Sequence, residues 1–256
     1  MTENETIKLV KSDEVASITF ARPKHNVFNI DMMRELCATL EDVSHDDSLK
    51  CVVFYGEGAS WCAGVDVGDH KPEMAPDMIA TFNRSLTLIG ALEIPSIAAV
   101  HGNCLGGGME YAIACDVVIA SKNAKFGQPE VKLGFLPPYA AIRLPLLVGP
   151  AKAIEVCTSG KIYSADEAQL MGFISQSVAS DEFTETVVRL IHEIQASSPL
   201  ILRLNKRAVN QHMGLSPKDA LEGVSDLFLN TLMKTEDTQE GIASFYEKRR
   251  PDWKNR

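Results

Sequence analysis

The sequence predicts an α/β fold in which short buried strands alternate with helices, followed by an all-helical C-terminal region. The strands are indicated by short apolar runs such as Cys51–Tyr55 and Ile97–Val100. Beyond Asp181 the apolar spacing is helical almost to the end of the chain. With 256 residues, 45% of them hydrophobic, the chain can bury a large core. We therefore expect a core over residues 1–195 and a helical region over residues 196–256.

The predicted elements follow one another along the chain in this alternating order. Asp31 can cap a helix that continues to about His45, because apolar residues from Met32 to Val43 recur near helical spacing. Pro95 breaks the chain between a helix and the strand that follows it. Strands are expected at 15–20, 51–55, 97–100, 116–120 and 172–178, helices at 76–92, 140–148, 151–159 and 164–171, a loop over 125–139, and breaks in the terminal helices at Pro199 and Pro217.

Composition excludes several classes of partner. The net charge of −9 argues against nucleic acid or an anionic membrane as the main partner. The chain contains no run of about 18 apolar residues, so we expect no membrane span. Met1–Glu5 lacks the basic and apolar regions of a signal peptide, and we expect a cytoplasmic protein. The six cysteines form no CxxC pair and the six histidines show no ligand spacing with them, which predicts reduced thiols and no metal site.

Three consecutive glycines, Gly106–Gly108, lie between the strand at 97–100 and an apolar helix with Glu110 in its first turn. Glycines at a helix start leave backbone N–H groups unscreened, and the helix dipole reinforces them. Such a site suits a phosphate, or an oxygen that gains negative charge during a reaction. A tight turn that merely lets strand and helix pack closely explains the glycines equally well.

A second glycine-containing loop, Gly56–Asp66, follows the strand at 51–55 and begins like a dinucleotide-binding loop. Trp61 occupies the position of the third glycine, however, and no helix is expected to begin there. No glycine loop in the chain is followed by Gly-Lys-Ser or Gly-Lys-Thr either. The sequence therefore fits neither of the two common phosphate-binding loops.

Four motifs in order along the chain resemble the crotonase (enoyl-CoA hydratase/isomerase) superfamily. They are Cys62–Asp66, Gly102–Glu110, Phe126–Glu130 and Phe245–Arg249. The resemblance implies a crotonase-type spiral of strand–strand–helix (ββα) units. It also implies that residues 196–256 form a helical trimerisation region, so the expected partner is a second copy of the chain in a homotrimer or a homohexamer built as a dimer of trimers.

The resemblance also implies an active site for an acyl-CoA thioester, with coenzyme A as part of the substrate and no separate cofactor. Two backbone N–H groups bind the thioester oxygen in this family, and they fall here at Val65 and Gly107. Such donors stabilise the negative charge that develops on the oxygen. Family hydratases use two glutamates as the base that activates water and the acid that protonates the enolate. Both positions are matched, by Glu110 and Glu130.

The two glutamates could instead be an ordinary solvated pair, which is the usual fate of this residue type. Glu110 argues against it, because it lies between a glycine loop and an apolar helix. Isomerases and thioester hydrolases of the superfamily often lack one member of the pair. Retention of both Glu110 and Glu130 therefore favours addition or removal of water, without saying which is the base.

One segment departs from ordinary enoyl-CoA hydratases. Phe135–Ala141 is bulky and rigid where those enzymes are glycine-rich. Together with Val67–Glu73 and the tail from Glu240, it resembles the branch of cyclohexa-1,5-diene-1-carbonyl-CoA hydratases. These add water by 1,4-addition to give 6-hydroxycyclohex-1-ene-1-carbonyl-CoA during anaerobic benzoyl-CoA degradation. A flat ring needs a wider pocket than a linear chain, and we expect Phe135 to Tyr139 to position it.

Further substrate contacts follow from family analogy or from position. The turn containing Lys24 and Asn26 is expected to bind coenzyme A, as are Phe245 and Lys248, which could come from a neighbouring subunit. A solvated charge is at least as probable for each lysine. His70 could line the acyl pocket, although a loop surface is the safer expectation. The remaining expected contacts are Ala63, Gly106, Phe135, Pro138 and Tyr139, the last as either a hydrogen-bond donor or a filler of volume.

Three functions remain open at this point. The first is the cyclic dienoyl-CoA hydratase. The second is a straight-chain 2-enoyl-CoA hydratase or a ring-opening oxo-acyl-CoA hydrolase of the same superfamily. The third is a crotonase-fold scaffold or RNA-binding protein, against which the two glutamates and the acidic balance without a basic stripe both count.

Overall fold

A computed structural model describes residues 6–256, and the segment 1–5 used in the localisation argument lies outside it. The larger sheet has six strands in the order β1-β2-β3-β5-β7-β10. β1 is antiparallel to β2, and the other neighbours are parallel. The strands are β1 (Ile7–Ser12), β2 (Val15–Phe20), β3 (Cys51–Gly56), β5 (Ser96–Val100), β7 (Val117–Ser121) and β10 (Gln176–Val178).

A smaller sheet has the order β4-β6-β8-β9, with β4, β6 and β8 parallel and β9 antiparallel to β8. Each of its parallel strands follows a strand of the larger sheet, so β3–β4, β5–β6 and β7–β8 are successive strand pairs, each followed by helices. This arrangement is the expected spiral of ββα units. The strands are β4 (Ser60–Cys62), β6 (Asn103–Leu105), β8 (Lys125–Gly127) and β9 (Ile162–Ser164).

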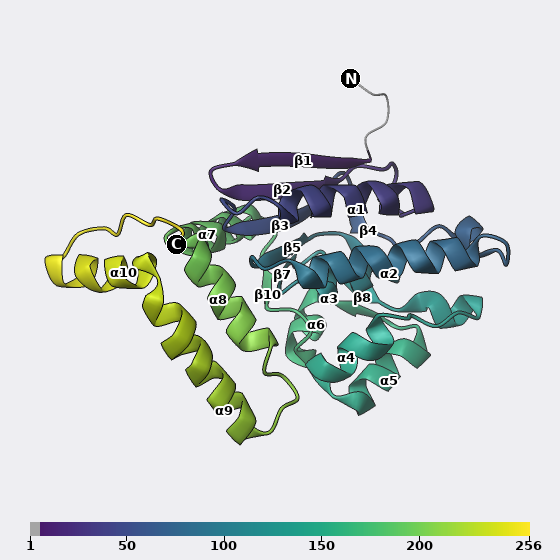
Figure 1. The fold of residues 1–256 in the computed structure, drawn as a ribbon. Coiled ribbons are helices and arrows are strands. Elements are labelled where there is room, and N and C mark those ends of the chain that lie inside the picture. Colours follow the sequence, from purple (N-terminus) through teal and green to yellow (C-terminus); the bar gives the residue numbers. More distant parts are fainter. Residues whose placement is uncertain (1–5) are drawn as a thin grey trace.

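Helices cover the spiral and continue beyond it (Figure 1). Around the spiral they are α1 (Ile30–Ser44), α2 (Ala75–Ala91), α3 (Gly107–Ala114), α4 (Ala140–Val148), α5 (Pro150–Ser159) and α6 (Ala165–Met171), with short turns η1 (Val67–His70) and η2 (Pro129–Leu133). The C-terminal part contains α7 (Phe183–Gln195), α8 (Pro199–Asn210), α9 (Pro217–Asp226), η3 (Leu227–Thr231), η4 (Leu232–Lys234) and α10 (Glu236–Glu247). No helix within residues 6–256 is long and apolar enough to cross a membrane.

The central strands are buried on both faces, as parallel strands covered by helices are. In β5, Ala98 and Val100 join the main core, while Ile97 and Ala99 face a second apolar cluster. Helix α7 covers that second cluster, to which it contributes Val187. The alternation explains why β5 reads as an uninterrupted apolar run in the sequence.

Helices α8 to α10 extend from the body, and α10 lies at the end opposite α2 and α5 (Figure 1). Asp237, at the start of α10, is buried and holds the C-terminal tail. Its carboxylate accepts hydrogen bonds from the N–H groups of Lys254 (2.6 Å) and Asn255 (3.0 Å) and from the Ser198 hydroxyl before α8. The division at residue 195 stays a prediction.

The predicted α/β architecture is confirmed, with corrections to its details. The cap of α1 is the side chain of Asn29, which accepts from the N–H of Met32, whereas Asp31 lies exposed in the first turn. The strand predicted at 172–178 is limited to β10. Strands β1, β4, β6 and β9 were not predicted, and β8 was expected to be loop. The strands β4, β6, β8 and β9 have three residues each, which is too few to show alternation, and β1 is an edge strand that is buried only at Ile7.

Candidate active site

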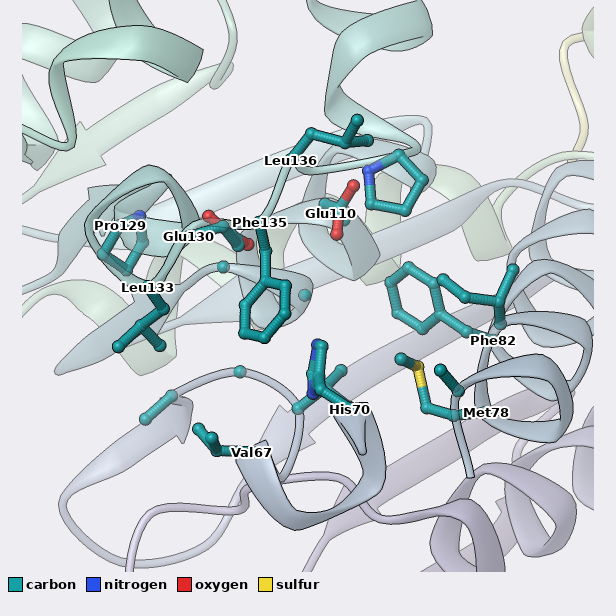
Figure 2. Close-up of a pocket in the computed structure, with 18 residues that line it drawn as sticks. Val67, His70, Met78, Phe82, Glu110, Pro129, Glu130, Leu133, Phe135 and Leu136 are labelled. Carbon is teal, nitrogen blue, oxygen red and sulfur yellow. The ribbon is translucent and has the colours of Figure 1, made fainter. Parts of the chain in front are cut away.

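A cavity of about 390 Å³ opens where the three parallel strands of the smaller sheet end (Figure 2). Ala63 follows β4, Gly106 follows β6, and Pro129 comes shortly after β8. The carboxyl ends of parallel strands meet at one edge, which is where α/β proteins place their ligands. Eight predicted site residues line this cavity: Ala63, Val65, Gly106, Gly107, Glu110, Glu130, Phe135 and Pro138.

The backbone N–H of Val65 points away from the neighbouring segment around Phe28. Gly64 and Asp66, on either side of it, both bond to Phe28, with N···O distances of 2.9 and 2.7 Å. Backbone groups alternate in direction along an extended chain, so the N–H of Val65 points to the opposite side. Within residues 6–256 this N–H donates to no other group. It is therefore available to a ligand.

Gly107 supplies the second free N–H, as the first residue of α3, where an N–H has no partner inside the helix. A Cβ at Gly107 would lie only 2.6 Å from Cγ2 of Val65. Glycine is thus required for the two segments to approach this closely. The two residues whose amides are expected to bind one oxygen are direct neighbours across the cavity wall.

Glu110 is buried, with 2% of its surface exposed, and its carboxylate is fixed by the start of α4. Oε1 accepts hydrogen bonds from the N–H groups of Tyr139 (2.6 Å) and Ala140 (2.8 Å). Within residues 6–256 no donor reaches Oε2. One oxygen is therefore held in place and the other is free for chemistry.

Glu130 lies on η2 and is half-buried beside Gly106. A Cβ at Gly106 would lie 2.7 Å from Oε1 of Glu130, and Gly106 has a φ of 54°. The amide nitrogen of buried Gln128 must face the carboxylate, because an oxygen there would meet only acceptors. In this orientation it donates to both carboxylate oxygens, over 2.9 and 3.0 Å.

Burial dominates the electrostatics of the two carboxyl groups. It raises the pKa of Glu110 to about 8, the negative charge of Glu130 adding to the effect and the N–H groups of Ala140 and Tyr139 opposing it. Burial likewise raises the pKa of Glu130 to about 7. Figure 2 shows both carboxyl groups on the same side of the cavity. Near neutral pH the pair can therefore hold one proton, which provides an acid and a base together.

The rest of the cavity is mainly apolar. Phe82 and Met78 of α2 form one wall, and Phe135 faces them from the segment between η2 and α4 (Figure 2). The Phe135 ring packs on the imidazole of His70, with ring centroids 4.7 Å apart. Pro138 completes the wall near Glu110. These groups give the cavity a mainly apolar lining, which is typical of a pocket for a small organic ligand.

Three further features of the site could not be assigned from the sequence. Gln128 is next to a recognised motif, but its bond to Glu130 depends on the turn of η2. The hydrogen bonds from Tyr139 and Ala140 at the start of α4 to Glu110 span 29 and 30 positions of the sequence. His70 does line the cavity, against the safer expectation of a loop surface.

Tyr139 acts differently from its prediction. Its side chain does not line the cavity and packs against the core, while its N–H binds Glu110. Asn26 is 2% exposed, and its amide donates to the carbonyls of Glu57, Ser60 and Trp61. The Asn26 side chain therefore shapes the turn and is not free to hold a coenzyme.

The other predicted coenzyme contacts are not part of the cavity. Lys24 is exposed in the turn between β2 and α1. Phe245, 79% exposed, and Lys248 lie at the end of α10, on the far side of the molecule from α2 (Figure 1). Within one chain they cannot contact a ligand in this cavity, and their role stays a prediction. Among the described residues no group of acidic, histidine or cysteine side chains could hold a metal.

Comparison with known proteins gives a consistent result. The family model for enoyl-CoA hydratase/isomerase matches residues 10–256. The chain is 34% identical to a short-chain-enoyl-CoA hydratase of Clostridium acetobutylicum over 99% of this chain and 100% of that one. It is 35% identical to a crotonyl-CoA hydratase of Syntrophomonas wolfei, covering 97% and 98%. A crystal structure of an enoyl-CoA hydratase from Bacillus anthracis superimposes with a TM-score of 0.93 at 27% identity, covering 98% and 100%.

Proposed function

The chain belongs to the enoyl-CoA hydratase/isomerase family and is a hydro-lyase of the enoyl-CoA hydratase kind; we propose that Glu110 and Glu130 are its acid–base pair. One observation carries this proposal. Both carboxyl groups, with raised pKa values, line the same apolar cavity as the free amides of Val65 and Gly107. Chemistry that needs an oxyanion site, a base and an acid has all three in one place.

In the proposed reaction the thioester oxygen accepts hydrogen bonds from the N–H groups of Val65 and Gly107. The ionised glutamate of the pair removes a proton from water as the water oxygen bonds to the β-carbon of the enoyl group. The electron pair of the double bond moves toward the thioester and forms an enolate, whose oxygen charge the two amides stabilise. The protonated glutamate then delivers its proton to carbon, and the pair ends with the one proton it had at the start.

We further propose that the acyl group is a cyclic dienoyl group, as in cyclohexa-1,5-diene-1-carbonyl-CoA. Phe82, Phe135 and Pro138 form stiff walls, which suit a flat ring better than a chain that must bend. In such a substrate water adds to the β-carbon, the charge spreads over a dienolate, and the proton is delivered to the far end of the diene. The reaction that supplies this substrate would be a reductive dearomatisation of benzoyl-CoA.

A straight-chain enoyl-CoA is the second candidate substrate. It is favoured by the relatives named short-chain-enoyl-CoA hydratase and crotonyl-CoA hydratase, which match nearly the whole chain at 34% and 35% identity. The same amides and carboxyl groups would serve, with protonation at the α-carbon. The two candidates differ in how well the walls of the cavity fit the acyl group and in the carbon that receives the proton.

The test compares kcat/KM for cyclohexa-1,5-diene-1-carbonyl-CoA with that for crotonyl-CoA, with the products separated by chromatography. The proposal expects the cyclic substrate to be preferred by at least about tenfold and to give 6-hydroxycyclohex-1-ene-1-carbonyl-CoA. A preference for crotonyl-CoA would establish the straight-chain alternative. Free acid and coenzyme A as products would indicate a hydrolase and overturn the hydratase proposal.

We also propose that the turn at Lys24 and the residues Phe245 and Lys248 hold coenzyme A in an assembly of three or six copies. Because α10 is remote from the cavity of its own chain, Phe245 and Lys248 would act in the site of a neighbouring copy. Analytical ultracentrifugation gives the number of copies. Chains that carry both Phe245→Ala and Glu110→Gln can be mixed with wild-type chains, so that only the wild-type sites are active. In these mixed assemblies the KM of the wild-type sites should rise, because their neighbours lack Phe245.

A further inference from the structure

Helix α4 has no capping side chain of its own in the described part of the chain. Its first N–H groups, those of Tyr139 and Ala140, donate instead to Oε1 of Glu110 on α3. Free N–H groups and the helix dipole favour a negative charge at this end of a helix. The place of the Glu110 carboxylate therefore depends on where α4 begins.

Arg143, one turn further along α4, makes the converse contact. Its Nε donates to the backbone oxygen of Ile113 over 3.1 Å. Ile113 lies in the last turn of α3, where carbonyl oxygens have no partner inside the helix and a positive charge is favoured. Arg143 therefore caps the end of α3, just as Glu110 caps the start of α4.

The two contacts hold the helices in a fixed register. Ile113 follows Glu110 by three positions, and Arg143 follows Ala140 by three positions. Residues three apart lie on one face of a helix, so the two contacts are one turn apart on facing sides. One contact alone would allow α4 to turn or slide against α3, whereas the two together prevent it.

Arg143 lies outside the acyl site. It lines a separate cavity of about 170 Å³, which shares no described residue with the cavity that contains Glu110. The acidic side chain of this smaller cavity, Asp116, is bound through Oδ2 by Lys206 (2.6 Å) and by the N–H of Ser96 (2.8 Å). An effect of Arg143 on the reaction therefore has to pass through α3 and α4.

We propose that Arg143 is a positioning residue for Glu110: it holds α4 against the end of α3, so that the first N–H groups of α4 stay on Oε1 of Glu110. The inference rests on the proposed acid–base role of Glu110. These N–H groups lower the pKa of Glu110 against the effect of burial, so their withdrawal would raise it further. A substitution at position 143 leaves the other titratable groups around Glu110 unchanged. They are His70 on η1, Tyr111 on α3, Glu130 on η2, Tyr139 before α4 and Cys157 on α5.

The first test is the kinetics of Arg143→Met, which keeps the bulk of the side chain and removes its donor and its charge. Its kcat should fall about 10- to 100-fold because Glu110 is misplaced. Its KM should stay within about threefold of wild type, because the cavity walls are unchanged. The alkaline limb of kcat/KM, expected near about pH 8 in the wild type, should move up by about one pH unit. A loss of stability alone lowers the folded fraction and leaves this limb in place.

Three further variants sharpen this test. Arg143→Lys keeps a charged donor and should restore kcat to within about threefold of wild type. Arg143→Gln is too short to reach Ile113, and it should repeat the Arg143→Met result with a polar side chain if Arg143→Met folds poorly. Arg189→Met is the matched control, because Arg189 donates to the Thr186 hydroxyl within α7 (3.4 Å) and lies outside the cavity. It should keep the wild-type kcat and pH profile.

The second test does not depend on catalysis. In protein with isotope-labelled glutamate carboxyl groups, the NMR signal of Glu110 is identified by its absence in Glu110→Gln, and its titration gives the pKa directly. This pKa should be higher in Arg143→Met than in the wild type and unchanged in Arg189→Met. An unchanged pKa in both Arg143→Met and Arg143→Gln would overturn the inference. A raised pKa with a wild-type kcat would keep the positioning role and overturn the proposed function of Glu110.

Discussion

Two buried acidic side chains at different ends of the molecule, one proposed for proton transfer and one that holds the C-terminal tail, differ in how their oxygens are hydrogen-bonded. Glu110 is 2% exposed and Asp237 is 1% exposed. Both oxygens of Asp237 are occupied, by the N–H groups of Lys254 and Asn255 and the Ser198 hydroxyl. Within the described residues 6–256, Glu110 accepts hydrogen bonds at Oε1 alone. The Asp237 carboxylate is therefore saturated, whereas Glu110 keeps Oε2 free in the cavity that it lines.

The largest expected effect comes from removing the acid–base function. Glu110→Gln or Glu130→Gln should lower kcat by about 10²–10⁴-fold, because general acid–base catalysis typically contributes that factor. The fold should persist, since glutamine has nearly the same shape. Enoyl-CoA hydration is followed by the loss of the absorbance of the double bond conjugated with the thioester, and circular dichroism checks the fold. A kcat within tenfold of wild type in either variant would remove that residue from the pair.

Gly106 tests whether the position of the Glu130 carboxylate depends on close packing. Gly106→Ala would place a methyl group 2.7 Å from Oε1 of Glu130 in a left-handed backbone region, and should reduce kcat about 100-fold by displacing the carboxylate. Gly214→Ala is the control, because Gly214 has a φ of 81° and nothing within 4 Å of the added atom. Equal kcat values for the two variants would show that displacement of the Glu130 carboxylate does not lower kcat.

The saturated carboxylate should show the opposite behaviour. Asp237→Ala leaves buried donors of the tail without an acceptor and should lower the free energy of unfolding by about 2–4 kcal/mol. The kcat of the folded fraction at saturating substrate should stay within about threefold of wild type, because Asp237 is remote from the cavity. Urea unfolding and kcat measured on the same preparation separate the two effects. A loss of kcat without a loss of stability would refute the structural assignment.

The raised pKa values predict a bell-shaped dependence of kcat/KM on pH. Below about pH 7 both carboxyl groups become protonated and the base is lost, and above about pH 8 both ionise and the acid is lost. Outside this window the rate should fall about tenfold per pH unit. Stopped-flow measurements in buffers of constant ionic strength give the profile. A rate that keeps rising above about pH 9 would show that no protonated carboxyl group is needed.

The smallest effect concerns stability. The pKa of Glu110 is raised above its unfolded value of 4.5, so its protonated form stabilises the fold at low pH, and this contribution is lost as the pH rises through about 8. Glu110→Gln resembles the protonated form permanently. Its Tm should match wild type near about pH 5 and exceed it by a few degrees near about pH 9. Asp237→Asn should lower Tm at both pH values. If Tm changed in the same direction in both variants at both pH values, the proposed difference between Glu110 and Asp237 would be wrong.

The sequence predicts the parallel strands of the larger sheet and most helices because their signals are local. Runs such as Ile97–Val100 and the spacing in α1 depend only on neighbouring residues. The motifs around Gly107 and Glu130 likewise point, through family resemblance, to residues that line the cavity. Local signals suffice for the parts of the molecule that local contacts build.

The remaining features arise from contacts between distant segments. The Gly106–Glu130 approach, the start of α4 at Glu110 and the tail bound by Asp237 each join residues at least 17 positions apart. Nothing near Asp237 in sequence distinguishes it from an exposed acidic residue. A three-residue strand such as β6 is too short to predict, yet its end places Gly106 and Gly107 at the cavity.

The most direct test of the central claim is a crystal structure of the protein with a non-reactive enoyl-CoA thioester analogue. The thioester oxygen should lie about 2.7–3.1 Å from the backbone nitrogens of both Val65 and Gly107. The carboxyl groups of Glu110 and Glu130 should both lie beside the carbon that accepts water. A thioester oxygen that contacts neither nitrogen, or a β-carbon out of reach of both carboxyl groups, would contradict the account.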